Sequence, residues 1–459
     1  MRQSAAMRRA ALIFLMLSGC ATVPARPPEV PVAQVGVAFD REGEVGSFAE
    51  GLADPAAGRA VTPDDPVRIA SISKLVVAIG VMKLVEQGRL DLDGDVSRWL
   101  GWNLRNPTFP DRPITLRQLL SHTGSVRDFE DQYAIPLGDS VQSIMAAPTS
   151  WDPKNAPGAG HFKYSNLNFP IVASIVEHVT RERFDQWMRR EVIEPMKLDA
   201  CYNWPTCSDS KVARAVVLMQ DGKAVRDDLG GKRPDCPVYV ETGPCDLGRW
   251  KLGENGALFS PQGGLRISMR DLARVGRMLL NGGTFDGVRI LSPRSVETML
   301  HPTWQYDGRN GDTDQGFYCA YGLAVQLLPT PIHGCRDDPV GDGIPRLGHA
   351  GDAYGLRSGL WIDRANGTGV AYFVTGLSEN PPRGRSAYRA AEEAAFKRSL
   401  LLSGSVPCSM RRNRTKAANH LRCRYADVHK RDWDYLYAFI RRPGALDLKP
   451  FRRPRARHR

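Results

Sequence analysis

The sequence predicts an α+β fold, an α/β sandwich in which an antiparallel sheet from both chain ends is flanked by helices and carries an inserted, mainly helical lobe. Short apolar runs near the amino end, at residues 32–39 and 45–52, have the length of strands. Two similar runs, 355–363 and 369–376, stand near the carboxyl end, and longer helix-like runs lie between. Strands at both ends with helices between them favour one shared sheet with an inserted lobe.

Each element follows from a local pattern. Turn residues between the first two apolar runs predict a hairpin, and Asn366-Gly367 predicts the turn between the last two. A further strand is expected at 321–328. Segment 201–262 is rich in Cys, Pro, Gly and Asp and is too long for an ordinary loop, so we expect an insertion near a binding face. The apolar spacing predicts helices at 71–87, 115–121, 167–179, 185–196, 271–281 and 387–402.

The composition is that of a folded protein. The chain has 459 residues, of which 42% are hydrophobic, and no apolar run reaches the 18 residues of a membrane-spanning helix. The net charge of +12 comes from one segment, because residues 405–459 hold 16 Lys and Arg against 4 Asp and Glu. The rest is balanced, so we expect no nucleic-acid partner. We expect residues 404–459 to be a disordered basic tail; binding to anionic lipid or polymer is the alternative.

The amino end has the pattern of an export signal. Residues 1–19 combine a basic start, a short apolar stretch at 10–17 and small residues. The sequence Leu-Ser-Gly-Cys, which ends at Cys20, resembles the bacterial lipobox, so we expect Cys20 to be lipidated and the protein to be held in the periplasm at the outer membrane. A plain signal peptide with an incidental cysteine is the alternative. The Pro-rich segment 20–32 is expected to be a tether.

The cysteine pattern agrees with export. Eight cysteines remain if Cys20 carries a lipid, and an oxidising compartment favours disulfides between near neighbours, although some could be free thiols. No Cys-x-x-Cys motif or zinc-like Cys/His spacing occurs, so we expect no metal and no cofactor. The neighbouring couples are Cys201/Cys207, Cys236/Cys245, Cys319/Cys335 and Cys408/Cys423.

The clearest chemical signal is Ser71-Ile72-Ser73-Lys74 at the start of an apolar helix. A serine one helical turn before a lysine places both side chains on one face, and burial in an apolar helix lowers the pKa of the lysine toward that of a general base. Spacing alone is weak evidence, because Ser208 and Lys211 stand at the same interval. That second pair lies in the polar insertion and opens no long apolar helix, so context favours Ser71.

Two further motifs follow in order. Tyr164-Ser165-Asn166 is the single Tyr-x-Asn in the chain, and His349-Ala350-Gly351 comes later, beside the strands of the carboxyl end. The His-x-Gly pattern also occurs at His122, before the tyrosine motif. Taken singly, Asn166 reads as a helix cap, Tyr164 as a core aromatic and His349 as a surface residue. Because the two motifs follow Ser71 in this order, we favour a shared catalytic site over these separate structural roles.

With these motifs the chain resembles the serine β-lactamase-like family, which includes class C β-lactamases, penicillin-binding DD-peptidases and related esterases. The segments 114–124 and 263–265 add to the likeness, which runs over about residues 33–402. It implies a serine hydrolase domain at 33–403. The resemblance implies that Ser71 is the nucleophile of an acyl-enzyme, with Lys74 as its base and Tyr164 relaying the proton; which of the two takes the first proton stays open.

The resemblance also implies substrate contacts. Asn166 holds the substrate amide or the Lys74 ammonium, His349 and Gly351 line the strand edge, and the Asp352 N–H completes an oxyanion hole with that of Ser71. β-Lactamases carry a lysine where this chain has His349, and a mostly neutral imidazole is a weaker partner for a substrate carboxylate. We therefore expect weak or no β-lactamase activity.

The sequence as a whole predicts an exported, lipid-anchored serine hydrolase. Its substrate is expected to be a small ester or amide, or a peptidoglycan-type peptide. The alternative is a non-catalytic lipoprotein of the same fold that binds cell-wall peptide. Intact Ser71, Lys74 and Tyr164 speak against that alternative.

Overall fold

The computed structural model describes residues 29–226 and 233–403, and the fold below refers to these ranges. The predicted signal at 1–19, the lipidation site Cys20, the pair Cys408/Cys423 and the basic tail lie outside the described residues. No helix in the described ranges is long and apolar enough to span a bilayer.

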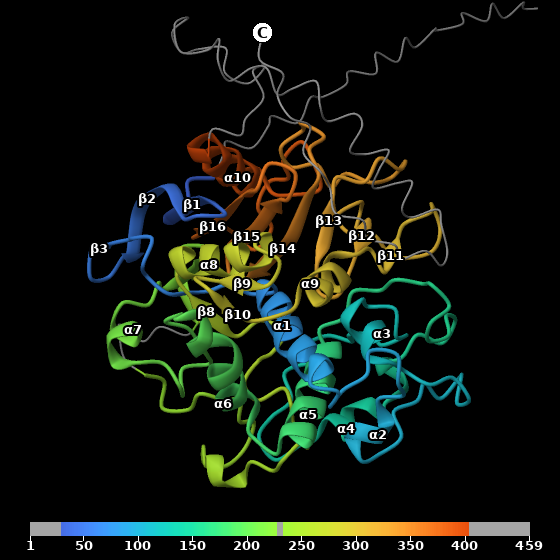
Figure 1. The fold of residues 1–459 in the computed structure, drawn as a ribbon. Helices are drawn as coiled ribbons and strands as arrows, with labels where there is room; N and C mark the ends of the chain where they lie inside the picture. The colour runs from blue at the N-terminus through green and yellow to red at the C-terminus, as the bar shows by residue number, and fades with distance from the viewer. Residues whose placement is uncertain (1–28, 227–232, 404–459) are drawn as a thin grey trace, which may run out of the picture.

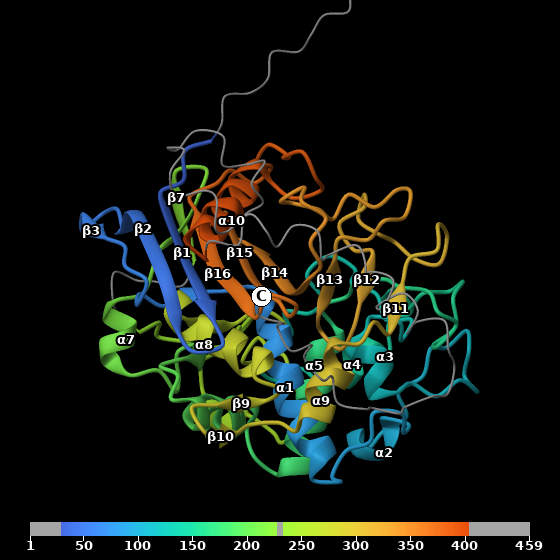
Figure 2. The ribbon, with the colours of Figure 1, turned by 45° about the horizontal axis from the view of Figure 1, so that its top comes forward.

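The architecture is a large antiparallel sheet above a mainly helical lobe (Figure 1). In the described chain the sheet has nine strands, in the order β11-β12-β13-β14-β15-β16-β1-β2-β3. Strand β1 pairs with β16 on one side and β2 on the other, with Ala33 opposite Thr375, so the first and last strands of the described chain are neighbours within the sheet (Figure 2). This confirms the expected sheet from both ends. The strands are β1 (Ala33–Asp40), β2 (Glu44–Asp54), β3 (Arg59–Ala60), β11 (Trp304–Gln305), β12 (Ala320–Tyr321), β13 (Gln326–Leu328), β14 (Arg346–Ala353), β15 (Leu356–Asp363) and β16 (Thr368–Thr375).

Helices cover both faces of this sheet. Helix α10 (Ala390–Ser403) packs on β16, β1 and β2 from the outer face, while α8 (Met269–Leu280) packs on β16, β1 and β15 from the inner face. Helix α1 (Ile72–Glu86) contacts β14 and β15 from the inner face and runs down into the lobe (Figure 1). Its side chains are buried almost all round, as the uninterrupted apolar sequence predicts.

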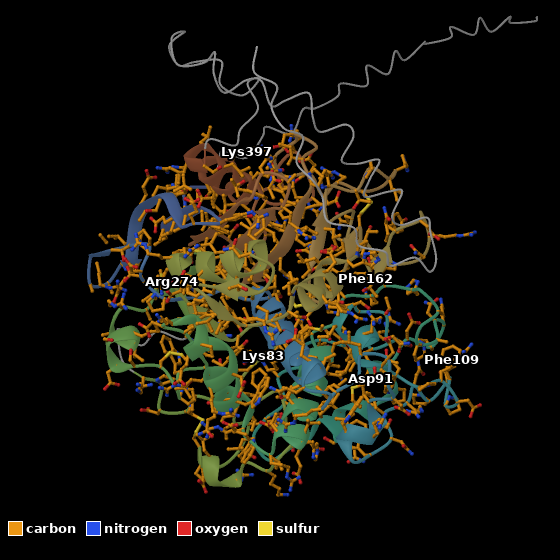
Figure 3. The ribbon with its side chains drawn as sticks, in the orientation of Figure 1. Lys83, Asp91, Phe109, Phe162, Arg274 and Lys397 are labelled. Atoms are coloured by element: carbon orange, nitrogen blue, oxygen red, sulfur yellow. A yellow bond between two sulfur atoms is a disulfide. The ribbon has the colours of Figure 1, made fainter. Side chains whose placement is uncertain are left out.

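The lobe surrounds the far part of α1. There Lys83, which is labelled in Figure 3, forms an ion pair with Glu191 at 3.0 Å and also donates to the Glu191 carbonyl. Helix α5 packs against α2, α3 and α6. The remaining helices are α2 (Ser97–Leu100), α3 (Leu116–Leu120), α4 (Val141–Met145), α5 (Asn168–Thr180), α6 (Phe184–Met188), α7 (Asp209–Ala213) and α9 (Pro293–Leu300).

Three short sheets complete the described structure. One of them, β4-β8-β5, lies beside the start of α1 and joins the lobe to the large sheet. Their strands are β4 (Val67–Arg68), β5 (Cys201–Tyr202), β6 (Leu218–Gln220), β7 (Lys223–Arg226), β8 (Leu265–Ile267), β9 (Thr284–Phe285) and β10 (Val288–Arg289).

The structure corrects two expectations. Residues 321–328 are not one strand: β12 and β13 are joined by a tight turn, in which Gly322 N donates to Val325 O at 2.8 Å and Ala324 has a φ of +55°. The expected helix at 185–196 is divided, because only residues up to Met188 are α-helical. A short π-helix follows at Arg189–Ile193 and a 3₁₀ turn at Glu194–Met196. Strand β14 was not predicted at all.

Candidate active site

Ser71 stands at the turn that opens helix α1. Ala70, directly before it, has a φ of +49°, a left-handed conformation that costs energy for a residue with a side chain. Ser73 braces this turn, since its hydroxyl donates to Ala70 O at 2.7 Å and accepts from Leu265 N at 3.1 Å. Ser73 is therefore structural. Ser71 keeps its side chain half-buried at a helix N-terminus, where the helix dipole favours developing negative charge.

Lys74 is fully buried and bonded to three oxygens. Its Nζ lies 2.9 Å from Ser71 Oγ, 2.8 Å from Asn166 Oδ1 and 2.8 Å from Gln262 O. Burial lowers the pKa of Lys74 from 10.5 to about 7, partly opposed by the negative charge of Asp128. A substantial fraction of Lys74 is thus a neutral amine near pH 7, beside the serine hydroxyl.

Tyr164 and Asn166 lie just before helix α5, and both side chains contact Lys74. The Tyr164 ring centroid is 5.0 Å from Lys74 Nζ. Its hydroxyl is buried, with Ser71 and Tyr318 as the neighbouring hydroxyl groups. Burial raises the pKa of Tyr164, so the phenol is neutral near pH 7. The structure therefore brings Ser71, Lys74, Tyr164 and Asn166 together, as the motifs predict.

Asp128 is a part of this site that the sequence analysis missed. Its Oδ1 accepts from Ser165 Oγ at 2.7 Å and Leu167 N at 3.0 Å. Its Oδ2 accepts from Asn166 N at 2.7 Å and Asn166 Nδ2 at 3.0 Å. One carboxylate thus fixes the whole turn that carries Tyr164 and Asn166.

The first His-x-Gly motif supports the tyrosine. The His122 ring stacks on that of Tyr164 with centroids 4.3 Å apart, and its Nδ1 accepts from Ser165 N at 3.1 Å. Burial holds the pKa of His122 well below its usual value, so the ring is uncharged. Phe162 lies behind this stack, between the lobe and strands β11–β13 (Figure 3), and packs on Trp304 at 4.3 Å.

The third motif lies on β14. His349 is fully buried and lines neither cavity described below. Its Nδ1 is 2.5 Å from the Ala350 carbonyl, which can only accept, so Nδ1 carries the proton and Nε2 accepts from the Tyr321 hydroxyl at 2.7 Å. Burial, and then the charge of Lys74, lower the pKa of His349 to about 3. In this arrangement His349 contacts Tyr321, and its expected role in substrate binding stays a prediction.

Gly351 and Asp352 bring β14 up to the nucleophile. A Cβ at Gly351 would lie 2.3 Å from Ile69 O and 3.3 Å from Ala70 Cβ, so only glycine allows this approach. Asp352 follows on the wall shared with Ser71, and its carboxylate pairs with Arg357. The residue expected to contribute the second oxyanion N–H thus stands beside Ser71.

Two cavities meet at Ser71. The larger, about 600 Å³, is in the size range of small-molecule sites. Described residues of segment 201–262 form one of its walls, with Trp204, Cys236 and Val238 among the lining residues. The smaller cavity, about 100 Å³, lies toward α10. It is lined by charged side chains, among them Arg357, Arg389 and Glu392.

Disulfides join the expected neighbours. In the described ranges Cys201 pairs with Cys207, Cys236 with Cys245 and Cys319 with Cys335, with Cα atoms 5.1, 5.6 and 6.0 Å apart. The second of these fastens the part of the insertion that lines the larger cavity.

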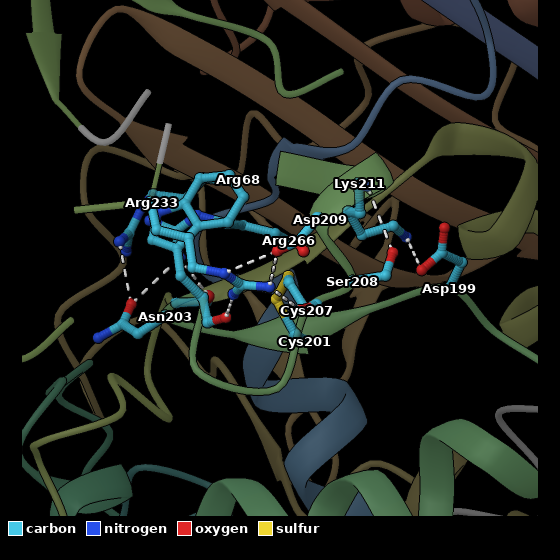
Figure 4. Close-up of a disulfide and its surroundings, with 12 residues drawn as sticks. Arg68, Asp199, Cys201, Asn203, Cys207, Ser208, Asp209, Lys211, Arg233 and Arg266 are labelled. Carbon is cyan, nitrogen blue, oxygen red and sulfur yellow. Dashed lines mark hydrogen bonds and ion pairs between the residues drawn. A yellow bond between two sulfur atoms is a disulfide. The ribbon is translucent and has the colours of Figure 1, made fainter. Parts of the chain in front are cut away.

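The second Ser-x-x-Lys pair, Ser208 and Lys211, does not form a catalytic site. Next to the Cys201–Cys207 disulfide, Ser208 caps helix α7 and its hydroxyl accepts from Lys211 N at 3.3 Å (Figure 4). The Lys211 ammonium pairs with Asp199 at 3.2 Å instead. No cluster of three or more His, Cys, Asp or Glu placed to hold a metal occurs among residues 29–226 and 233–403.

Comparisons with known proteins agree with this geometry. The family model described as Beta-lactamase matches residues 28–395. Esterase EstB of Burkholderia gladioli is 32% identical over 348 residues, an alignment that covers 70% of this chain and 80% of the esterase. Penicillin-binding protein 4 of Amycolatopsis lactamdurans is 26% identical over 349 residues, covering 76% of this chain and 81% of that protein.

Solved structures share the fold. The D-amino acid amidase of Ochrobactrum anthropi SV3 complexed with L-phenylalanine has a TM-score of 0.59 at 19% identity, covering 82% of this chain and 94% of the amidase. The octameric penicillin-binding protein homologue of Pyrococcus abyssi has a TM-score of 0.58 at 21% identity, covering 81% of this chain and 74% of that one. The chain belongs to the β-lactamase family of serine hydrolases.

Proposed function

We propose that this protein hydrolyses an ester or amide through an acyl-enzyme on Ser71. The observation that carries the proposal is the contact of Lys74 Nζ with Ser71 Oγ at 2.9 Å, by a lysine whose pKa is lowered to about 7. A base with a pKa near the working pH is the most effective in proton transfer. Tyr164 is a neutral phenol, which suits a proton relay better than a first base.

The chemical steps follow from these positions. Lys74 takes the proton of Ser71, whose oxygen attacks the substrate carbonyl, and the oxyanion is held at the backbone N–H groups of Ser71 and Asp352. The proton passes by way of Tyr164 to the leaving alcohol or amine as its bond to carbon breaks. Water then attacks the acyl-enzyme and gives a proton to Lys74. Lys74 passes this proton to the Ser71 oxygen as the acyl–oxygen bond breaks, so that the acid leaves and both Ser71 and neutral Lys74 are restored.

The substrate we propose is a small ester or amide, or a peptidoglycan-type peptide. A cavity of about 600 Å³ beside Ser71 accommodates groups of that size. The names of the relatives, an esterase, penicillin-binding proteins and a D-amino acid amidase, support the same range. We propose weak or no β-lactamase activity, because His349 is neutral and places no cation where β-lactamases have a lysine.

A labelling and substrate experiment tests the proposal. The purified protein is treated with a fluorophosphonate probe and screened with p-nitrophenyl esters, nitrocefin and D-Ala-D-Ala peptides. Labelling and turnover should disappear in Ser71→Ala. They should stay near wild type in Ser208→Ala, the matched serine of the second motif. A wild-type protein that binds peptide without labelling would instead support the non-catalytic alternative.

We also propose that the protein is exported and held at the outer membrane by a lipid on Cys20. The support is the sequence pattern at residues 1–20 together with the disulfides, which favour an oxidising compartment. In a bacterial host, Cys20→Ser should move the protein from the outer-membrane fraction to the soluble periplasm. Continued sedimentation with the membrane would contradict the lipid anchor.

A further inference from the structure

The side chain of Asn166 connects Lys74 to Asp128. Asn166 Oδ1 lies 2.8 Å from Lys74 Nζ, and Asn166 Nδ2 donates to Asp128 Oδ2 at 3.0 Å. A carboxylate cannot donate, so Asp128 selects the amide orientation in which the oxygen of Asn166 faces the lysine.

That orientation decides where the lone pair of a neutral lysine points. Neutral Lys74 has two N–H donors and one lone pair. Asn166 Oδ1 and the Gln262 carbonyl are both acceptors only, so they take the two N–H groups. The third contact, Ser71 Oγ at 2.9 Å, is then left for the lone pair. In this arrangement the amine receives a hydrogen bond from the serine hydroxyl and is ready to accept its proton.

We propose that Asp128 is a positioning residue for proton transfer, because it fixes the Asn166 amide so that the Lys74 amine faces Ser71. The inference rests on the proposed function. Asp128 is suited to the role, since its four bonds hold the turn before α5 and leave the Asn166 amide no second orientation.

Asp128 also sets the charge around the lysine. Four titratable side chains surround Lys74 in the described structure. His122 and His349 are uncharged because burial lowers their pKa values, and Tyr164 is neutral because burial raises its pKa. Asp128 is the negative group that opposes the lowering of the pKa of Lys74.

Asp128→Asn separates this role from simple bracing of the loop. An amide at position 128 can donate, which favours the flipped Asn166 with its NH₂ toward Lys74. We expect kcat/KM on a neutral ester to fall about 10- to 100-fold at its plateau, as part of a general-base contribution. Loss of the charge should also move the acid limb of the pH profile, near 7 in the wild type, to lower pH by about one unit.

A double-mutant cycle makes the test specific. The loss of kcat/KM in Asp128→Asn should depend on the side-chain amide of Asn166. When Asn166→Ala has already removed that amide, adding Asp128→Asn should therefore lower the plateau of kcat/KM only slightly further. Additive losses with an unmoved acid limb would overturn the proposal. Asp152→Asn is the matched control: Asp152 braces a neighbouring loop by accepting from Lys154 N at 2.8 Å and Asn155 Nδ2 at 3.0 Å, and it should leave both readouts unchanged.

A further variant covers a failure to fold. Asp128→Glu keeps the charge and the acceptors, so its acid limb should stay at the wild-type pH even if the plateau drops; a limb moved downward would contradict the proposal. Failure of the proposed function looks different, since the wild type would then hydrolyse no ester or amide and Ser71→Ala would change nothing.

Discussion

The imidazole of His349 accepts a hydrogen bond from the hydroxyl of Tyr321 at 2.7 Å, and neither residue lines the larger cavity at Ser71. Both groups are fully buried, and the other ring nitrogen of His349 is already bonded to the Ala350 carbonyl. This pair couples β14, which lies against the nucleophile, to β12. His349 therefore has a structural role: its hydrogen bond with Tyr321 holds β14 and β12 together beside the site.

Tyr321→Phe should destabilise the fold. The substitution leaves His349 Nε2 buried without a partner, which costs about 1–3 kcal/mol in the free energy of unfolding. Tyr306→Phe is the control, because the exposed Tyr306 hydroxyl donates to Gly308 O at 2.7 Å and its loss should stay within about 0.5 kcal/mol. Urea unfolding of both variants at pH 7 measures the difference, and equal losses would contradict a buried pair.

Substrate charge should not be sensed through His349. The pKa of His349 is lowered to about 3, so the ring does not titrate between pH 5 and 7. Lys74 must be neutral for every substrate, so its titration cancels in a ratio. We expect the ratio of kcat/KM for an anionic and a neutral ester to stay constant over this range. A ratio that falls through pH 6.5 would show a titrating imidazole at the substrate.

Strands and helices could be predicted from the sequence where a local pattern of apolar and turn residues determines them. Strands β1, β15 and β16 lie within two residues of their predicted bounds, because their short apolar runs end at turn residues. Helix α1 was equally clear, because its apolar stretch is long. The order of the three motifs led to the residues that the structure gathers around Lys74.

Contacts between distant segments could not be predicted. Asp128 bonds residues 37 to 39 positions further along the chain, and nothing in its local sequence distinguishes it from any loop aspartate. Strand β14 escaped notice because Gly348 and Gly351 interrupt its apolar pattern, although packing against Leu360 and Ile69 requires both glycines. The turn at Gly322 was hidden within an apolar run.

The Cys236–Cys245 disulfide should affect substrate binding more than chemistry. It encloses a short loop, so replacing both cysteines by serine should cost about 3 kcal/mol by the chain-entropy estimate. Because Cys236 lines the larger cavity and Lys74 does not, KM should rise while kcat changes little. Replacing Cys319 and Cys335, which line no part of that cavity, is the control and should spare KM. Non-reducing peptide mapping confirms the pairing first.

Lys74 should make the fold less stable at neutral than at alkaline pH. Its pKa is about 7 when folded and 10.5 in its ordinary state, so between these values the unfolded chain binds the extra proton. Stability therefore rises with pH across this window, and the penalty is fully present below pH 7. With 1.36 kcal/mol for each unit of pKa difference, and with both states only partly titrated at the ends of this range, the rise attributable to Lys74 between pH 7 and 10 is about 3.5 kcal/mol.

Lys74→Met isolates this effect. Methionine has no titrating group, so its own contribution to stability does not change with pH. As the pH rises from 7 to 10, the unfolding free energy of the wild type should therefore increase relative to that of the variant by the rise attributed to Lys74. Other groups titrate alike in both proteins and cancel. The variant should also lose all turnover, because Ser71 then has no base. A difference that stays flat with pH would mean that Lys74 keeps an ordinary pKa, and the general-base role proposed for it would lose its physical basis.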